Sequence, residues 1–144
     1  MQGAVNYFDI VQLIYCSRAA HSGDSALLER DVQDILVFGQ IRNFLHEITG
    51  ALVTDGEVFA HVLEGPIGAV EDLYSRITRD KRHSGVVTLQ HVPVHVRLFN
   101  HWPIAFIRVK SLHHLSTLNA RSTPAELRKA SVSILKAFRP VLLR

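Results

Sequence analysis

The chain lacks several features that define common protein classes. It has one cysteine, Cys16, so no disulfide can form within it. No stretch approaches the roughly 20 consecutive apolar residues that cross a bilayer, so we expect no membrane association. No secretory signal opens the sequence, and together with the lone cysteine this predicts a reducing, cytoplasmic location. Charge is also sparse: charged residues make up 20% and the net charge is +3, which is weak evidence for a nucleic-acid partner.

Motifs of enzymes and of metal sites are also missing. The sequence contains no glycine-rich phosphate loop, no nucleophile elbow and no paired catalytic carboxylates, so we expect no enzymatic activity. The nine histidines do not suggest a metal site either. His91 and His95 would lie about 13 Å apart on one strand, too far to share an ion. The adjacent pair His113 and His114 would point apart in any regular element.

The residues that are present predict one folded domain of mixed α+β class. Apolar residues make up 47%, and 144 residues suit a single core. Periodicity predicts the strands 8–15, 51–53, 58–63, 86–94 and 104–109, and the helices 27–45 and 66–81. This βαββαββ order favours a ferredoxin-like sheet with two helices on one face. We assign residues 1–110 to this unit and residues 111–144 to a C-terminal helical extension of the same domain, with a short segment at 111–118 and a helix at 124–138.

Three patterns of side chains stand out within this fold, although most of the apolar faces among them suit core packing. On the first helix, one narrow face carries Asn43 among apolar residues, and a buried amide without partners costs about 1–3 kcal/mol. On the third strand, alternation places Phe59, His61 and Leu63 on one side. The second helix has an apolar stripe, and Arg76, Asp80 and His83 lie beside it. That stripe consists of Val70, Leu73, Tyr74 and Ile77.

Five segments, in order and at fitting spacing, make the chain resemble the BLUF family, which senses blue light using FAD. They are Leu13–Ala19, the helix with Asp34-Ile35-Leu36 and Asn43 followed by Ile48-Thr49-Gly50, the run Val58–Gly65, Asp80–His83, and Phe99–Trp102. The resemblance implies a non-covalently bound FAD whose ring lies between the two helices, against the sheet. In the family a tyrosine, an asparagine and a glutamine bind the flavin edge. Here Tyr15 and Asn43 match the first two.

The resemblance also assigns roles to other residues. Ile35, Phe59 and Leu63 would form apolar walls, while Arg76, Asp80 and His83 match positions that contact the ring or flank its ribityl-phosphate chain. From the residues alone, Arg76 and Asp80 equally suit a solvated surface ion pair. Trp102 and position 104 belong to the family's route for passing the signal to the last strand.

The chain departs from the family at its switch. His61 stands where the family has the glutamine whose amide reorients or tautomerises in light. An imidazole offers one donor and one acceptor on a wider ring, and it can become charged near neutral pH. We therefore expect flavin binding to survive and the lasting red-shifted state to weaken or disappear. Two smaller departures are Arg42, where some relatives have a second asparagine, and Ile104, where relatives often have methionine.

We find no output domain in the 144 residues besides the part that resembles the family. We therefore expect signalling through a separate protein or through a change of assembly. The helix 124–138 has an apolar stripe that needs a surface to cover. We predict that it takes part in a homodimer or larger assembly; a tail folded onto its own sheet is the alternative. Two further alternatives to a photoreceptor are a light-insensitive flavin-binding protein and a ferredoxin-like module that binds protein or RNA.

Overall fold

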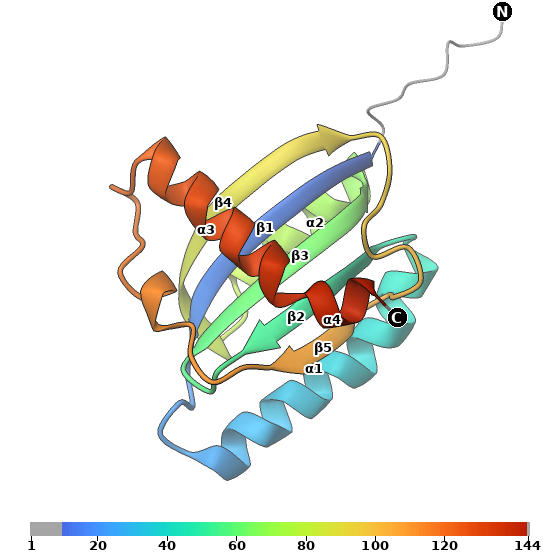
Figure 1. Cartoon of the computed structure of the whole chain (residues 1–144). Coiled ribbons are helices and arrows are strands. Elements are labelled where there is room, and N and C mark those ends of the chain that lie inside the picture. Colours follow the sequence, from blue (N-terminus) through green and yellow to red (C-terminus); the bar gives the residue numbers. More distant parts are fainter. Residues whose placement is uncertain (1–9, 144) are drawn as a thin grey trace, which may run out of the picture.

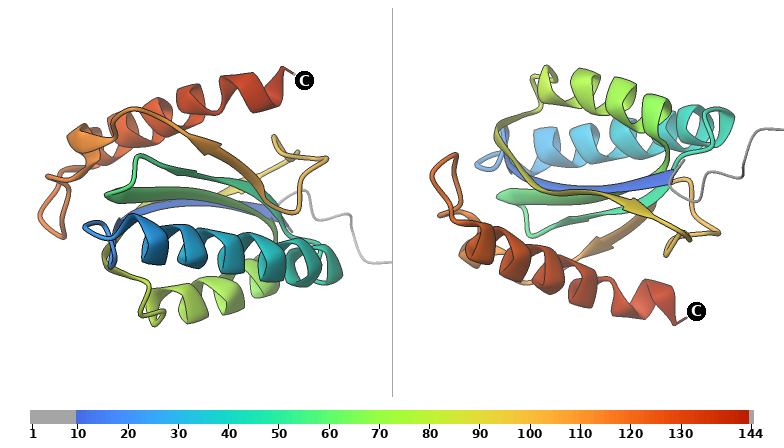
Figure 2. Two further views of the ribbon diagram at one scale, coloured as in Figure 1. Left: turned by 90° about the horizontal axis from the view of Figure 1, so that it is seen from below. Right: turned by 90° about the horizontal axis from the view of Figure 1, so that it is seen from above.

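The computed structural model describes residues 10–143, which form a five-stranded sheet with helices on both faces (Figures 1 and 2). The element order confirms the predicted βαββαββ core and its helical extension. The elements are β1 (Ile10–Ala19), α1 (Ser25–Leu45), β2 (Thr49–Thr54), β3 (Val58–Pro66), α2 (Ile67–Thr78), β4 (His83–Val94), β5 (Ala105–Arg108), a 3-10 turn η1 (His113–Leu115), α3 (Pro124–Ala137) and α4 (Arg139–Leu142). Positions 8 and 9 of the predicted first strand lie outside the described residues.

The central strand of the sheet is β3, because the strand order is β4-β1-β3-β2-β5. All neighbours pair antiparallel except β2 and β5, which are parallel. Pro93 lies on an edge strand, β4, where a missing N–H is tolerated. Every residue of β3 from Val58 to Gly65 is buried. A strand buried on both faces must supply apolar side chains in both directions, and β3 does so.

Turn chemistry explains where the elements begin and end. Asp24 caps α1 by accepting hydrogen bonds from two backbone N–H groups. Asp55 and Gly56 form the predicted hairpin turn, in which Gly56 has a φ of +98°. Gly50 is required by packing, because a Cβ there would lie 1.9 Å from the Val62 carbonyl oxygen.

The second helix is shorter than predicted at its C-terminal end. Pro66 is its N-cap rather than a first-turn residue, and α2 ends at Thr78 instead of near Lys81. The Asp80 carboxylate accepts from the backbone N–H and the guanidinium of Arg82, which closes a turn that leads into β4. Local side-chain bonding of this kind competes with helix continuation.

The C-terminal tail covers the sheet face opposite α1 and α2 (Figure 2). Its helix α3 begins with the predicted proline, and Thr123 and Glu126 form a capping box. Ala130, Ile134 and Phe138 are buried against the sheet. The tail stripe therefore has an internal partner, and the reason for placing a dimer contact on it no longer holds. With both faces covered, the sheet also offers no open platform for stacking RNA bases.

We predict that the tail unfolds together with the sheet as one cooperative unit. Phe138 is fully buried and packs edge-to-face on Phe99, with ring centroids 5.4 Å apart. Phe138→Ala should lower the free energy of unfolding by about 3–5 kcal/mol in urea, with a single transition. Val132→Ala, half exposed on the same helix, should change it by less than about 0.5 kcal/mol. A separate early transition in Phe138→Ala would mean that the tail is an independent appendage.

Candidate functional site

A cavity opens between α1 and α2 on their side of the sheet. It has a volume of about 790 Å³ including its open mouth, within the range of small-molecule sites. Nine of the eleven residues proposed from the sequence line it. They are Tyr15, Ile35, Asn43, Phe59, His61, Arg76, Asp80, His83 and Ile104. Strands β1 and β3 form its floor, the two helices form its sides, and the turn before β4 closes one end.

Leu63 and Trp102 do not line the cavity. Leu63 is on the same face of β3 as His61 but lies two residues further along the strand. There it packs under the start of α2, with Val70. Trp102 is half-buried and packs with the cluster on the tail side of the sheet. Its carbonyl accepts a hydrogen bond from the backbone N–H of Gly50. The tryptophan therefore contacts the opposite layer from the cavity.

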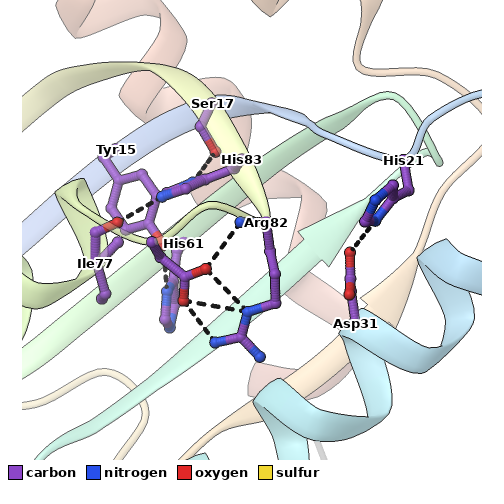
Figure 3. A network of polar contacts seen from close by, with 9 residues as sticks. Tyr15, Ser17, His21, Asp31, His61, Ile77, Arg82 and His83 are labelled. Atoms are coloured by element: carbon purple, nitrogen blue, oxygen red, sulfur yellow. Dashed lines mark hydrogen bonds and ion pairs between the residues drawn. The ribbon is translucent and has the colours of Figure 1, made fainter.

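The centre of the cavity floor is a pair of directly opposed residues, Tyr15 on β1 and His61 on β3. The Tyr15 hydroxyl lies 2.9 Å from His61 Nδ1, as Figure 3 shows. The other ring nitrogen, Nε2, is buried and has no hydrogen-bond partner within residues 10–143. If Tyr15 donates to Nδ1, the only unpaired group is the Nε2–H. The opposite tautomer would leave two groups unpaired, the tyrosine O–H and a bare Nε2, so the first arrangement is favoured.

Burial holds both side chains in their neutral forms. Desolvation lowers the pKa of His61 to about 3, and the nearby His83 adds to the effect. Desolvation likewise raises the pKa of Tyr15 above its usual range. The expectation that His61 could become charged near neutral pH is not supported by this environment, since the ring is 5% exposed. His61 is therefore a neutral group that directs one N–H away from Tyr15.

The rest of the cavity wall is fixed by hydrogen bonds to the backbone. Asn43 does not cap its own helix; its Nδ2 donates to the Pro103 carbonyl at 3.0 Å. Gln40, one turn earlier, donates to the Ile104 carbonyl. His83 donates from Nε2 to the Ile77 carbonyl at 2.6 Å, while its Nδ1 lies 2.7 Å from the Ser17 hydroxyl (Figure 3). These contacts fix the ends of α1 and α2 relative to the sheet.

The mouth of the cavity is cationic. Arg42, Arg76 and Arg82 line it, with Asp80 as the only carboxylate among its lining residues. Arg82 is paired with Asp80 through several hydrogen bonds, and this contact holds the pKa of the Asp80 carboxyl below its usual range. Arg76 has only a distant, exposed contact with Asp72 at 3.7 Å. Two guanidinium groups, one from each helix, are thus available to an anion.

Sequence reasoning missed some of the lining residues. Arg82 lies within the segment Asp80–His83 that carried the family resemblance, and its charge was a usable signal. Leu73 and Ile77 line the cavity although their stripe predicted only core packing. Phe38 also lines it, yet it is 68% exposed and lies outside the apolar face that predicted the buried side of α1. Periodicity could not have found Phe38.

Two other features, a metal site and a membrane-spanning helix, are absent from the described part of the chain. No group of three or more histidine, cysteine, aspartate or glutamate side chains gathers there as a metal site would require. None of its helices is long and apolar enough to cross a membrane.

Comparison with known proteins gives consistent results. Residues 10–105 match the BLUF family model, described as sensors of blue-light using FAD. Over 90 residues the chain is 37% identical to photoactivated adenylate cyclase subunit alpha of Euglena gracilis, a match that covers 62% of this chain and 8% of that protein. The chain thus spans less than a tenth of the length of this relative.

Solved structures are also similar. BlrB, a BLUF protein in its dark state, superposes with a TM-score of 0.67 at 26% identity, covering 89% of this chain and 98% of BlrB. Klebsiella pneumoniae BlrP1 with FMN and cyclic diGMP gives a TM-score of 0.66 at 26% identity, covering 90% of this chain and 34% of that one.

The low pKa of His61 predicts how stability depends on pH. Below pH 6.5 the unfolded chain binds a proton at this ring that the folded chain does not, so stability falls as pH falls towards 3. Between pH 7 and pH 4 the wild type should lose about 3 kcal/mol more stability than His61→Gln, measured by urea unfolding. His101→Gln, at an exposed position, should behave as the wild type. Equal pH dependence in wild type and His61→Gln would contradict a buried neutral imidazole.

Proposed function

The chain belongs to the BLUF family of blue-light sensors, and from that premise we propose that it binds FAD non-covalently in the cavity between α1 and α2 and senses light there. The observation that carries this proposal is the unpartnered Nε2 of His61. A buried N–H without an acceptor costs about 1–3 kcal/mol, which a ligand carbonyl or ring nitrogen on the cavity floor would recover. A flavin edge presents acceptors of this kind.

Other features of the cavity support a flavin as the ligand. Ile35, Phe59 and Ile104 supply apolar walls for a flat ring. Asn43 lines the same cavity, and its amide oxygen remains available to a donor after Nδ2 has bound Pro103. A smaller hollow of about 290 Å³ shares Arg42, Leu73 and Arg76 with the main cavity. This continuation gives the ribityl-phosphate chain a path past two arginines, which favours a phosphorylated flavin over riboflavin.

The chain's own residues then determine the response to light. A bound flavin would absorb blue light and accept an electron. Tyr15 is protonated, and its hydroxyl is held at His61 Nδ1 as a hydrogen-bond donor. His61 Nε2 keeps its proton toward the cavity. Turning the imidazole over would break the Tyr15 contact, and burial opposes a second proton on the ring.

This geometry distinguishes the histidine from the family's glutamine. A glutamine amide exchanges an oxygen for an NH₂ at the same place when it turns over, whereas His61 presents one fixed N–H donor. We therefore propose that flavin binding is intact and that the long-lived red-shifted state is weakened or lost. A light-insensitive flavin-binding protein is the second candidate, and the His61 substitution favours it. In either case we propose a sensor or binding protein rather than an enzyme, one that acts on a separate downstream protein.

Flavin binding can be tested by filling the cavity. The purified protein should be yellow or should take up FAD with quenching of flavin fluorescence. Ile35→Trp should weaken FAD binding at least tenfold, because the indole would occupy the space of the ring. Gln33→Trp, exposed on the same helix, should bind as the wild type. Circular dichroism confirms that both variants are folded. A colourless wild-type protein that takes up no added FAD would refute the proposal.

The photochemical role of His61 requires a second experiment. After blue light, His61→Gln should show a slowly decaying red-shifted absorption band that the wild type lacks or loses much faster. Because the pKa of His61 is about 3, wild-type behaviour should be the same at pH 6 and pH 8. An equally large and long-lived shift in both proteins would show that a fixed N–H donor suffices for switching.

A further inference from the structure

The outer side of α1 carries five large apolar side chains that nothing in residues 10–143 covers. Their exposed fractions are Val37 57%, Phe38 68%, Ile41 64%, Phe44 71% and Leu45 69%. At 100° per residue they lie on the side of the helix opposite Leu28, Val32 and Asn43, which face the sheet. We call these five residues the outer stripe.

The outer stripe differs from the apolar side chains exposed elsewhere. Between positions 10 and 143, eight further large apolar residues are exposed, and they are scattered over α1, α2, α3, α4, β4 and the connecting segments. Single exposed apolar residues are normal on protein surfaces, whereas a contiguous group marks an interface. Five within nine residues of one helix, spaced so that they share a face, form such a group.

The spacing of the outer stripe is symmetric about Ile41. Val37 and Leu45 lie four positions to either side of it, and Phe38 and Phe44 lie three. A two-fold axis through Ile41 that brings two α1 helices together antiparallel places residue i opposite residue 82 − i. Val37 then meets Leu45 of the other copy, Phe38 meets Phe44, and Ile41 meets Ile41. Such self-complementarity is what a two-fold interface between identical chains requires.

We propose that the outer stripe is a homodimer interface in which two α1 helices pack antiparallel about Ile41. Charge is compatible with this arrangement. The only charged residue between positions 37 and 45 is Arg42, which lines the cavity mouth and falls opposite the neutral Gln40 of the second copy. Asp34, one turn before the stripe, falls opposite position 48. Apart from the two Arg42 side chains, which lie one residue to either side of the axis at the edge of the stripe, no like charges oppose each other.

The area is sufficient for a weak, specific dimer. Five large apolar side chains, each more than half exposed, offer about 500 Å² per copy, or about 1,000 Å² in total. This value is the lower limit for a specific interface, so we expect a dissociation constant in the micromolar range. The inference rests on exposed side chains of α1, and of the five only Phe38 also lines the cavity.

Sedimentation equilibrium of the purified full chain between 1 and 200 µM tests assembly. The wild type should form a species of twice its 16.2 kDa mass. Ile41→Glu should raise the dimer dissociation constant at least tenfold, because it places two carboxylates on the two-fold axis. The matched control, Val132→Glu, changes an apolar position on α3 that is also more than half exposed, and it should leave dimerisation unchanged. Circular dichroism verifies the fold of each variant.

Cysteine cross-linking tests the register independently. Ile41→Cys should form a disulfide-linked dimer on oxidation. A mixture of Val37→Cys and Leu45→Cys should cross-link as a heterodimer, while each alone should not. The unmodified chain, whose Cys16 is buried, gives the background. The proposal is overturned by a wild type that is monomeric at 200 µM. It is also overturned by a dimer that Ile41→Glu does not weaken or that Val132→Glu disrupts, or by cross-links of Val37→Cys to itself.

Discussion

The burial of β3 on both faces is the constraint on which the other features of the structure depend. Because this strand is central, its side chains alternate between two buried layers, one under α1 and α2 and one under the tail. Any polar residue in it must find its partners inside the protein. Within residues 10–143, His61 finds one partner, the Tyr15 hydroxyl, and its second nitrogen finds none. The neutral state of the imidazole and the direction of its proton both follow from this position.

Glu64 shows the same constraint on the other face of β3. Its side chain is fully buried, and it accepts hydrogen bonds from the backbone N–H groups of Leu98 and Phe99 and from Gln12. This carboxylate fixes the segment between β4 and β5 on the tail side. On the helix side, Asn43 and Gln40 bind the carbonyls of residues 103 and 104. The segment that leads into β5 is thus bound from both layers. The carbonyl that Asn43 binds, at Pro103, belongs to the residue directly after Trp102.

The sequence predicted most of the fold because its periodicities record burial. The apolar run 58–63 and the stripe of α2 placed the sheet and helices correctly, and the family resemblance identified most of the cavity residues. Leu63 was assigned to the cavity because alternation gives the face of a residue but not its distance along the strand. The end of α2 depended on the turn between Asp80 and Arg82, a tertiary and side-chain effect that periodicity does not register. The sequence could not show which surface the tail helix covers. An apolar stripe predicts that some surface buries it, but the pattern does not distinguish the chain's own sheet from a second copy.

An apolar pattern does not name the surface that covers it, and for this reason the sequence alone did not predict the outer stripe. Helix α1 is apolar on two opposite sides, so its pattern is weakly amphipathic although each side has a definite role. The inner side forms the core and one wall of the cavity, and folding alone accounts for it. The outer side gains nothing from folding, because its side chains remain in water. Phe38 belongs to both regions: it lines the cavity mouth and is two-thirds exposed. Burying Phe38 in the proposed dimer would close part of that mouth. Ligand binding in the cavity and assembly through α1 would then be thermodynamically linked, and each would change the other by the same factor.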